Sequence, residues 1–168
     1  GLALPYSAGA PAPYEIRDRF CATAGSAVMD LIAQNLRPRD IVTRKSLENA
    51  ARVVAASGGS TNAGLHLPAI ANECGIDFDL NDVTEIFKST PYIADLKPGG
   101  RYVAKDLYEI GGVEVIMKAL LDGGYLHADC ITVTGKTIGE NLADVVFPTD
   151  QDVVCPTSNP ITRGARPR

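Results

Sequence analysis

The chain has 168 residues, of which 45% are hydrophobic and 21% charged, and its formal net charge is −4. This composition is typical of one globular domain and excludes predominant disorder. The acidic balance argues against a nucleic-acid-binding surface, and no apolar run approaches the roughly 18 residues that a membrane span needs. We therefore expect neither nucleic acid nor a membrane as a partner.

The first half of the chain is predicted to be helical after an irregular, proline-rich lead-in. Apolar residues recur at three- and four-residue steps over residues 14–35, which predicts an amphipathic helix. Thr43 is a good N-cap for a second helix to about residue 56. A third helix should end at Gly75, but Pro68 removes one of its hydrogen bonds. We expect a kink there, or a helix that starts only next to that proline.

The second half alternates short helices with glycine-rich breaks. Asp79 or Asn81 should cap a helix to about residue 88, and residues 91–96 should be extended. Further helices are predicted over residues 102–110, 113–121 and 137–142, and the best strand candidate covers residues 130–134. Strands are too few to cover the apolar faces of the helices. The fold class is therefore α/β but rich in helices, and the chain should be a piece of a larger sheet-containing unit.

Four cysteines lie far apart in the sequence, and no two form a Cys-x-x-Cys pair. That spacing gives no support for a zinc ribbon or a redox motif. No secretory signal is visible, so we expect a cytoplasmic protein with reduced thiols. Cys21, Cys74 and Cys130 are expected to pack as small hydrophobic side chains.

The most informative segment joins the second and third predicted helices and reads Ser-Gly-Gly-Ser-Thr-Asn-Ala-Gly over residues 57–64. Two glycines permit a tight turn, and the small polar residues Ser60, Thr61 and Asn62 can each cap a helix. An open helix N-terminus presents unpaired N–H groups that suit a carboxylate or a phosphate. The same pattern is also ordinary helix-start chemistry, so on its own it does not distinguish a binding loop from a helix start.

Gly135-Lys136-Thr137 follows the strand candidate and suggests a P-loop at first sight. That motif needs a glycine five positions before its Gly-Lys-Thr, and Cys130 occupies this position. We therefore expect no nucleotide binding by this segment. Thr134 or Thr137 should cap the next helix, and Lys136 is a candidate to face a pocket.

The two histidines, His66 and His127, do not form a metal-binding pattern, because neither has flanking carboxylates at ligand spacing. We expect His66 to be a core histidine or, alternatively, a pocket-facing donor, and His127 to be a surface or capping residue. The mixed charges over residues 95–106 should form a solvated face, or alternatively the rim of a pocket for an anion.

The sequence resembles the dihydroxy-acid dehydratase and sugar-acid (phosphogluconate) dehydratase family. The resemblance runs through ordered blocks at residues 36–50, 58–67, 94–103, 106–107, 111–113, 129–137 and 140–142. It covers residues 1–162, and the order of the blocks is far more specific than any one of them. The Ala-Asp-Leu-Lys-Pro segment that starts at Ala94 favours dihydroxy-acid dehydratase over the sugar-acid members.

The resemblance implies a hydro-lyase that removes water from a 2,3-dihydroxy acid to give a 2-keto acid, in branched-chain amino-acid biosynthesis. It implies an iron–sulfur cluster, 2Fe-2S or 4Fe-4S, as the Lewis acid and Mg²⁺ at the same site. It also implies an N-terminal α/β domain, a C-terminal barrel-like domain, and a homodimer or homotetramer.

The family's cluster-binding cysteine motifs lie upstream of the matched segment, and its catalytic serine motif belongs to the C-terminal domain. The four cysteines of this chain match none of those motifs, so the resemblance assigns it no catalytic residue and no metal ligand. Residues 1–144 should be the second half of the N-terminal domain. Residues 145–168 should be a linker or the start of a missing domain, ending in a basic, irregular tail. The chain alone is expected to be inactive and to bind no cluster.

Five residues are the substrate-binding candidates: Ser60, Thr61, Asn62, Lys136 and Thr137. Their expected ligand is a small dihydroxy acid, held together with the missing remainder of the enzyme. Two alternatives stay open. The parent could be a sugar-acid (aldonate) dehydratase, or the chain could be a non-catalytic anion-binding or interaction module.

Overall fold

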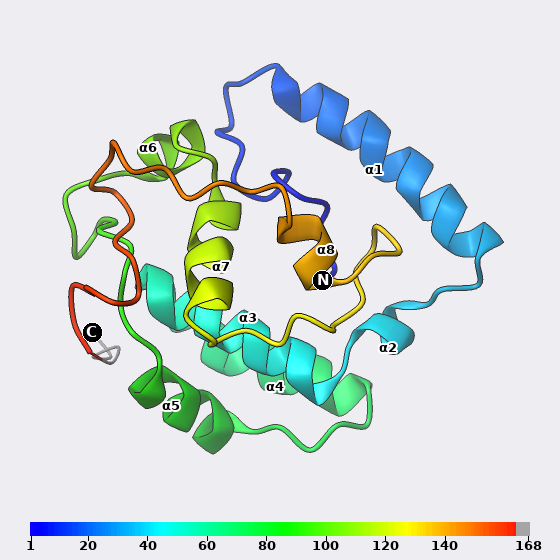
Figure 1. Ribbon diagram of the computed structural model, residues 1–168. Helices are drawn as coiled ribbons and strands as arrows, with labels where there is room; N and C mark the ends of the chain where they lie inside the picture. The colour runs from blue at the N-terminus through cyan, green and yellow to red at the C-terminus, as the bar shows by residue number, and fades with distance from the viewer. Residues whose placement is uncertain (164–168) are drawn as a thin grey trace.

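Eight α-helices form the regular structure of residues 1–163, the part of the chain that the computed structural model describes (Figure 1). They are α1 (Ile16–Ala33), α2 (Pro38–Ile41), α3 (Arg44–Ser57), α4 (Ala63–Glu73), α5 (Leu80–Ser89), α6 (Ala104–Glu109), α7 (Val113–Asp122) and α8 (Ile138–Leu142). The helix-rich prediction is confirmed. The single-turn helix α2 is the one that the sequence pattern does not predict.

Capping residues place the helix ends where the sequence puts them. The Thr43 hydroxyl accepts a hydrogen bond from the Ser46 N–H, and the Asp79 carboxylate accepts from the N–H groups that start α5. Thr137 caps α8 in the same way. Gly75, with φ of +69°, follows the end of α4 and turns the chain away in the left-handed region that glycine tolerates. These four predictions are confirmed.

Pro68 lies inside α4, which begins five residues earlier, at Ala63. The prediction of a helix that starts only beside this proline is wrong. The ring costs one hydrogen bond to Gly64, but the half-buried Leu67 and the buried Ala71 pack in a cluster with Leu47 of α3 and Phe78. This packing stabilises the helix despite the lost bond, because tertiary contacts outweigh local propensity.

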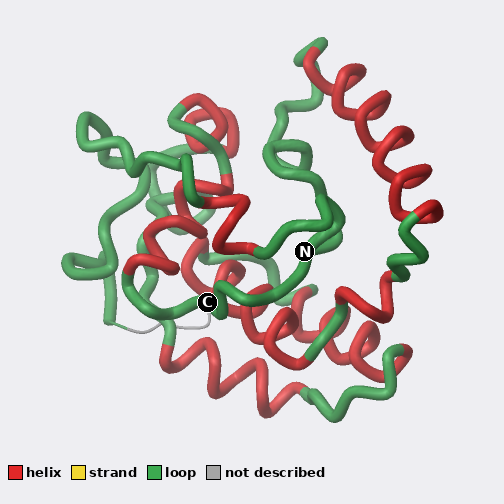
Figure 2. Tube along the Cα trace, turned by 45° about the vertical axis from the view of Figure 1, so that its right-hand side comes forward, coloured by secondary structure: helices red, strands yellow, loops and turns green. Residues whose placement is uncertain are grey.

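No β-strand forms within residues 1–163, and Figure 2 shows only helices and loops. The strand predicted over residues 130–134 is wrong, since only Ile131 makes a bridge, to Thr137. The chain reverses at Gly135, where φ is +74°, so the segment folds back before a ladder can extend. Residues 91–96 are extended as predicted, and they form isolated bridges to three different segments. The sheet of the expected α/β class is therefore not present in this part of the chain.

The main core surrounds α7. Its fully buried members include Ile116 and Leu120 of α7, Ile93 and Ala94 of the extended segment, and Val154. A second cluster joins α3, α4 and α5 through the buried side chains of Leu47, Ala51, Ala71, Phe78, Val83 and Ile86. Broad apolar helix faces, which the sequence predicts for α3 and α7, supply both clusters.

The C-terminal segment returns to the main core. The Asp95 N–H donates to the Val153 carbonyl and the Cys155 N–H to the Ile93 carbonyl, each at 2.8 Å. Residues 153 and 154 are buried by this return. The boundary predicted near residue 144 between two domains stays a prediction. The last five positions of the predicted basic tail, residues 164–168, lie outside the described residues.

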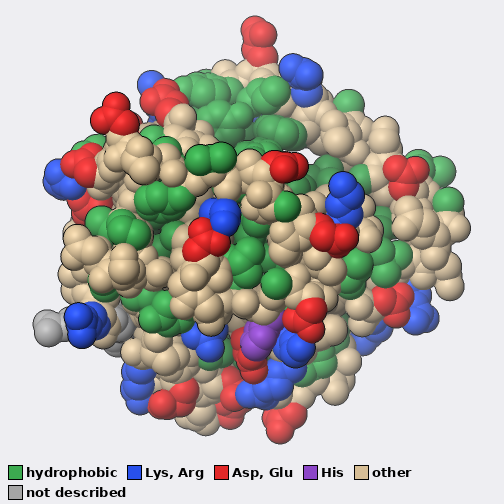
Figure 3. Space-filling view, in the orientation of Figure 1, with side chains coloured by type: hydrophobic (Ala, Val, Ile, Leu, Met, Phe, Trp, Pro, Cys, Tyr) green, Lys and Arg blue, Asp and Glu red, His purple; other side chains and the backbone are tan. Residues whose placement is uncertain are grey.

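Helix α1 begins and ends two residues inside the predicted bounds, and it contains no buried residue. It runs along the periphery in Figures 1 and 2, and hydrophobic side chains are visible on the surface there in Figure 3. Cys21 on this helix is exposed, so the prediction that it packs inside is wrong. Cys130 is buried as predicted, and Cys74 is half-buried. No described helix is both long and apolar enough to cross a membrane.

Candidate functional site

The loop after α3 turns on two glycines that the local space requires. Gly58 caps α3 with φ of +64°, and the Gly59 N–H donates to the Val54 carbonyl at 2.9 Å. A Cβ atom at Gly58 would lie 2.7 Å from Cε2 of the buried Tyr92, and one at Gly59 would lie 3.0 Å from a Val54 methyl. The turn is therefore specific to glycine for both conformational and steric reasons.

The helix N-terminus behind this loop is not open, which corrects the expectation from the sequence. The N–H groups of residues 63–66 donate to the carbonyl oxygens of Ser60, Thr61 and Asn62 at 2.9–3.2 Å. Asn62 already has helical backbone angles, and its side chain makes no capping bond. The first turn of α4 winds tightly enough to use donors that an α-helix start usually leaves free.

The loop nevertheless presents polar groups to solvent. Ser60, Thr61 and Asn62 are exposed, and the Ser60 hydroxyl accepts from the Asn62 N–H at 3.2 Å. Within residues 1–163, the Thr61 hydroxyl, the Asn62 amide and the N–H groups of Ser60 and Thr61 make no hydrogen bond. Donors and acceptors are thus available here for a carboxylate or hydroxyl ligand.

The second candidate segment, around Lys136 and Thr137, has a different structure. Thr137 is used in a capping box: its hydroxyl accepts from the Glu140 N–H at 3.1 Å and donates to the Glu140 carboxylate at 2.9 Å. The Thr137 N–H also donates to this carboxylate at 2.7 Å and lowers the pKa of Glu140. Lys136 is exposed, and its ammonium has no partner among the described residues. Only the lysine is free to contact a ligand.

The two candidate segments lie at opposite ends of α3. Lys45, near the first residue of this helix, pairs with Asp129 at 2.6 Å, and the Ile138 N–H donates to the Cys130 carbonyl at 2.8 Å. These contacts hold the segment of residues 129–138 beside the N-terminal end of α3. Gly58 ends the helix 13 positions beyond Lys45, about 20 Å away. One small acid cannot contact both segments in this arrangement.

A polar link along α3 has no signal in the sequence. The buried Asn49 donates to the His127 carbonyl at 2.9 Å and accepts from the His127 N–H at 2.8 Å. The His127 ring contacts Glu48 at 2.7 Å. His127 is therefore partly buried, and it joins the segment before Cys130 to α3. The surface position predicted for it agrees with the structure only in that the residue is partly exposed. His66 is exposed, so the prediction of a core histidine is wrong there.

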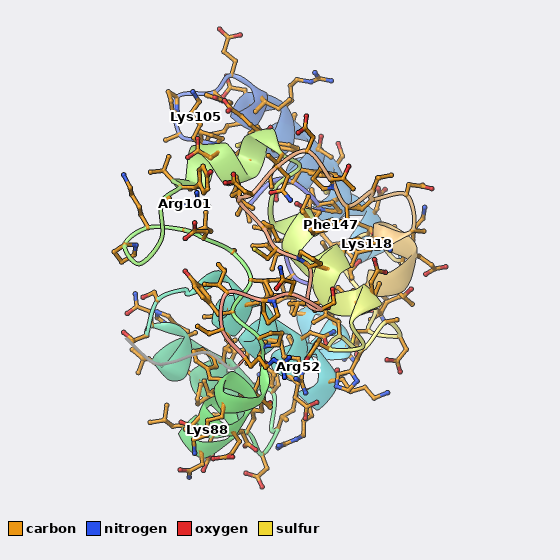
Figure 4. All side chains as sticks on the ribbon, turned by 60° about the vertical axis from the view of Figure 1, so that its left-hand side comes forward. Arg52, Lys88, Arg101, Lys105, Lys118 and Phe147 are labelled. Atoms are coloured by element: carbon orange, nitrogen blue, oxygen red, sulfur yellow. The ribbon has the colours of Figure 1, made fainter. Side chains whose placement is uncertain are left out.

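The mixed-charge stretch forms an ion-pair network. Arg101 pairs with Asp95 and, at 3.1 Å, with Asp152 of the returning segment. The Tyr102 hydroxyl hydrogen-bonds to Asp152 and, with Arg101, lowers the pKa of that carboxyl. Figure 4 shows Arg101 and Lys105 at the edge of the molecule. The sequence predicts a solvated face here. The stretch is exposed in part, but its ion pairs also join residues 95–102 to Asp152 of the returning segment.

Arg52 is a further residue that the sequence does not single out. The Nε atom of its side chain is buried and has no hydrogen-bond partner among residues 1–163. The residue lies on α3, toward the centre of the molecule in Figure 4. A buried guanidinium N–H without a partner is costly, because the energy of removing it from water is not offset by a hydrogen bond.

Two apolar cavities lie near the chain start. One, of about 130 Å³, is lined by the N-terminal segment together with Met117 of α7 and Leu142 of α8. The other, of about 250 Å³, lies against α3 and is lined by Asn49 and Cys130. Neither is lined by the five candidate residues, and Lys136 does not face them.

The donor set for a metal is incomplete in this part of the chain. No group of three His, Cys, Asp or Glu side chains is placed to hold a metal ion among residues 1–163. The four cysteines are unpaired thiols, and burial raises the pKa of Cys130, which opposes the thiolate form that a cluster needs. These residues do not fit an iron–sulfur cluster or Mg²⁺.

Comparison with known proteins identifies the relatives of this chain. Residues 1–141 match the family model described as the dihydroxy-acid/6-phosphogluconate dehydratase N-terminal domain. The chain is 75% identical over 162 residues to dihydroxy-acid dehydratase 2 of Bradyrhizobium diazoefficiens and 70% identical to dihydroxy-acid dehydratase of Parvibaculum lavamentivorans. It is 51% identical over 164 residues to that of Methylococcus capsulatus.

These alignments cover 96–97% of the chain but only 28–29% of each relative. The chain thus spans less than a third of the length of the curated relatives it matches. The match of the family model extends over most of the chain and includes the glycine loop, the Pro-Gly-Gly turn and the Gly-Lys-Thr segment. The chain therefore belongs to the dihydroxy-acid/6-phosphogluconate dehydratase family, as part of its N-terminal domain.

Proposed function

We propose that this chain is part of a hydro-lyase that converts 2,3-dihydroxy carboxylic acids into 2-keto acids in branched-chain amino-acid biosynthesis. The observation that carries this proposal is the 75% identity, over 96% of the chain, to a relative named dihydroxy-acid dehydratase. Identity at this level over many contiguous elements supports a shared reaction for the complete proteins. The chain itself contributes part of the N-terminal domain, and the complete enzyme is a cytoplasmic homodimer or homotetramer.

Dehydration of such an acid requires departure of the 3-hydroxyl, removal of the C2 proton and restraint of the carboxylate. The iron–sulfur cluster and Mg²⁺ implied by the family supply Lewis-acid chemistry when bound. Because residues 1–163 do not fit either group, we assign their ligands, and the general base, to parts of the enzyme outside these residues. No step of the reaction is assigned to a side chain of this chain.

The role left to this chain is to bind and orient the substrate. The loop of residues 58–62 offers two backbone N–H groups, the Thr61 hydroxyl and the Asn62 amide on a turn whose conformation and close packing require glycine. Groups of this kind bind a carboxylate or a hydroxyl without adding charge. We assign this loop to one wall of the substrate pocket in the complete enzyme. Lys136 is a separate candidate, because it lies at the other end of α3.

The test is an activity assay of the complete, cluster-loaded enzyme. A branched 2,3-dihydroxy acid and an aldonate are supplied in parallel, and the 2-keto product is measured. We expect turnover of the branched acid at least about tenfold more efficient in kcat/KM than turnover of the aldonate. Preference for the aldonate would establish the sugar-acid alternative. Absence of 2-keto product from both acids, with a full cluster, would refute the proposed reaction.

The loop assignment is tested in the same assay with Thr61→Val, which removes the hydroxyl and keeps the shape of the side chain. We expect KM for the branched acid to rise about tenfold or more, as for the loss of one hydrogen bond to a charged group. Thr84→Val, on the exposed face of α5, is the control because its hydroxyl only bonds back to the Leu80 carbonyl. Equal kinetics for both variants would contradict a substrate-binding role for the loop.

A further inference from the structure

Helix α1 carries two apolar stripes, and only one of them faces the rest of the molecule. Positions spaced by four, three and four residues share a helix face. On one such face Ile16, Phe20, Ala27 and Leu31 are all half-buried. This inner stripe is the less exposed face of α1, and next to it Arg17 donates a hydrogen bond to the Ala10 carbonyl of the N-terminal segment.

The second stripe contains Cys21, Gly25, Val28 and Ile32, with Met29 beside it, and every one of these residues is exposed. Val28, Met29 and Ile32 keep 53%, 64% and 67% of their surface accessible. A Cβ atom added at Gly25 would meet nothing within 4 Å. A glycine in the middle of a helix costs about 1 kcal/mol relative to alanine, and here the described residues provide no close contact to offset this cost.

The polar residues of α1 identify the side that faces water. Arg19, Thr23, Ser26 and Asp30 lie on a third face at the same spacing, and all are exposed. A surface helix of a finished protein shows one apolar stripe and a wide polar face. Beyond its first turn, which carries the charged Arg17 and Asp18, α1 shows a narrow polar stripe between two apolar ones. This pattern is typical of a helix covered on two sides.

We propose that the outer stripe of α1 (Cys21, Gly25, Val28, Met29 and Ile32) is the surface on which the remainder of the dehydratase polypeptide packs. The length of the relatives supports this occupant, since the chain covers only 28% of them and most of their polypeptide lies outside these 168 residues. The inference rests on the proposed function only in so far as it takes the chain to be part of such a longer enzyme.

A second copy of the chain is a poorer occupant because the stripe is small. From Cys21 to Ile32 the stripe runs along about 18 Å of helix, and at a width of about 10 Å it offers about 180 Å² per copy. A stable dimer buries about 800 Å² per partner. Packing within one polypeptide has no such threshold, since the chain connection removes most of the association cost.

The test compares Met29→Glu with Ser26→Glu in the complete enzyme, measuring the midpoint of thermal unfolding. Both substitutions introduce the same charge three positions apart, one on the outer stripe and one on the polar stripe. We expect Met29→Glu to lower Tm by at least about 3 °C and Ser26→Glu to change it by less than about 1 °C. If Met29→Glu prevents folding, the milder pair Met29→Ala and Ser26→Ala gives the same comparison.

Equal Tm values for the two members of a pair would overturn the proposal. A loss at Met29 that vanishes as protein concentration rises would also overturn it, since it would assign the stripe to a second copy. The reaction plays no part in this readout. If the activity assay fails but the Tm values differ as expected, only the proposed function is refuted. If the enzyme is active but the Tm values do not differ, only the proposal that the outer stripe is covered is refuted.

Discussion

Replacing Gly58 by alanine tests whether the turn after α3 depends on backbone conformation, on space, or on both. Gly58 has φ of +64°, and its missing Cβ would lie 2.7 Å from the ring of the buried Tyr92. Gly75 is the matched control, because its φ of +69° is nearly the same while a Cβ there would meet nothing within 4 Å. Both changes also restrict the unfolded chain equally.

The magnitudes follow from these geometries. A left-handed backbone costs an L-residue about 1–2 kcal/mol, and this cost applies at both positions. A carbon at 2.7 Å is about 1 Å inside the usual contact distance between carbon atoms. Tyr92 is 7% exposed and has little room to move, so overpacking adds about 1–3 kcal/mol at Gly58 alone. We expect Gly58→Ala to cost about 2 kcal/mol more than Gly75→Ala.

The assay is urea denaturation of each variant, followed by circular dichroism and analysed for the free energy of unfolding. A further variant, Tyr92→Leu, removes the ring and should reduce the extra cost of Gly58→Ala in a double-mutant cycle. If Gly58→Ala and Gly75→Ala lose the same stability, or if removal of the ring has no effect on the difference, the steric argument for this loop is refuted.

Three other outcomes can be measured on the same protein. Arg37 lowers the pKa of the Asp40 carboxyl from 3.8 to about 2. The contribution of this pair to stability is therefore present above pH 3.8 and is lost as the pH falls through about 2. NMR titration should show the low pKa of Asp40, and Arg37→Ala should return this pKa toward 3.8. Asn49→Ala should cost about 1–3 kcal/mol of unfolding free energy, because it leaves the partly buried main-chain N–H and carbonyl of His127 without partners. A cost well below about 1 kcal/mol would show that water replaces the lost bonds. Thr137→Ala should cost about 1 kcal/mol by removing the N-cap of α8, and Thr137→Ser should restore most of it, so equal losses for both would contradict the capping role.

Local chemistry accounts for the parts of this fold that the sequence predicts correctly. Thr43, Asp79 and Thr137 cap helices because a short side-chain oxygen reaches the N–H groups two or three residues ahead in the chain. Gly75 ends a helix because glycine tolerates the positive φ that turns the chain away from the helix axis, and this depends on the conformation of that one residue. No distant residue takes part in these outcomes, so a window of a few residues is enough to predict them.

The predictions that failed all depend on what a segment packs against. Cys21 and the segment around Ile131 have the composition of buried structure, yet one is exposed and the other forms a single bridge. Composition indicates that a residue can be buried, but a neighbour must be present to bury it. The same limit applies to Pro68, where packing of α4 outweighs the local cost of proline.

For the candidate site, the sequence singles out the polar residues but not their arrangement. The ordered motifs are enough to place the chain in its family, because residue order is itself the signal. Only the tertiary structure separates the Thr61 loop from Lys136 by the length of α3, closes the start of α4 with its own carbonyl groups, and leaves one face of α1 uncovered. Distances between residues far apart in the chain depend on the packing of whole helices, and this packing sums many weak contacts that no short stretch of sequence contains.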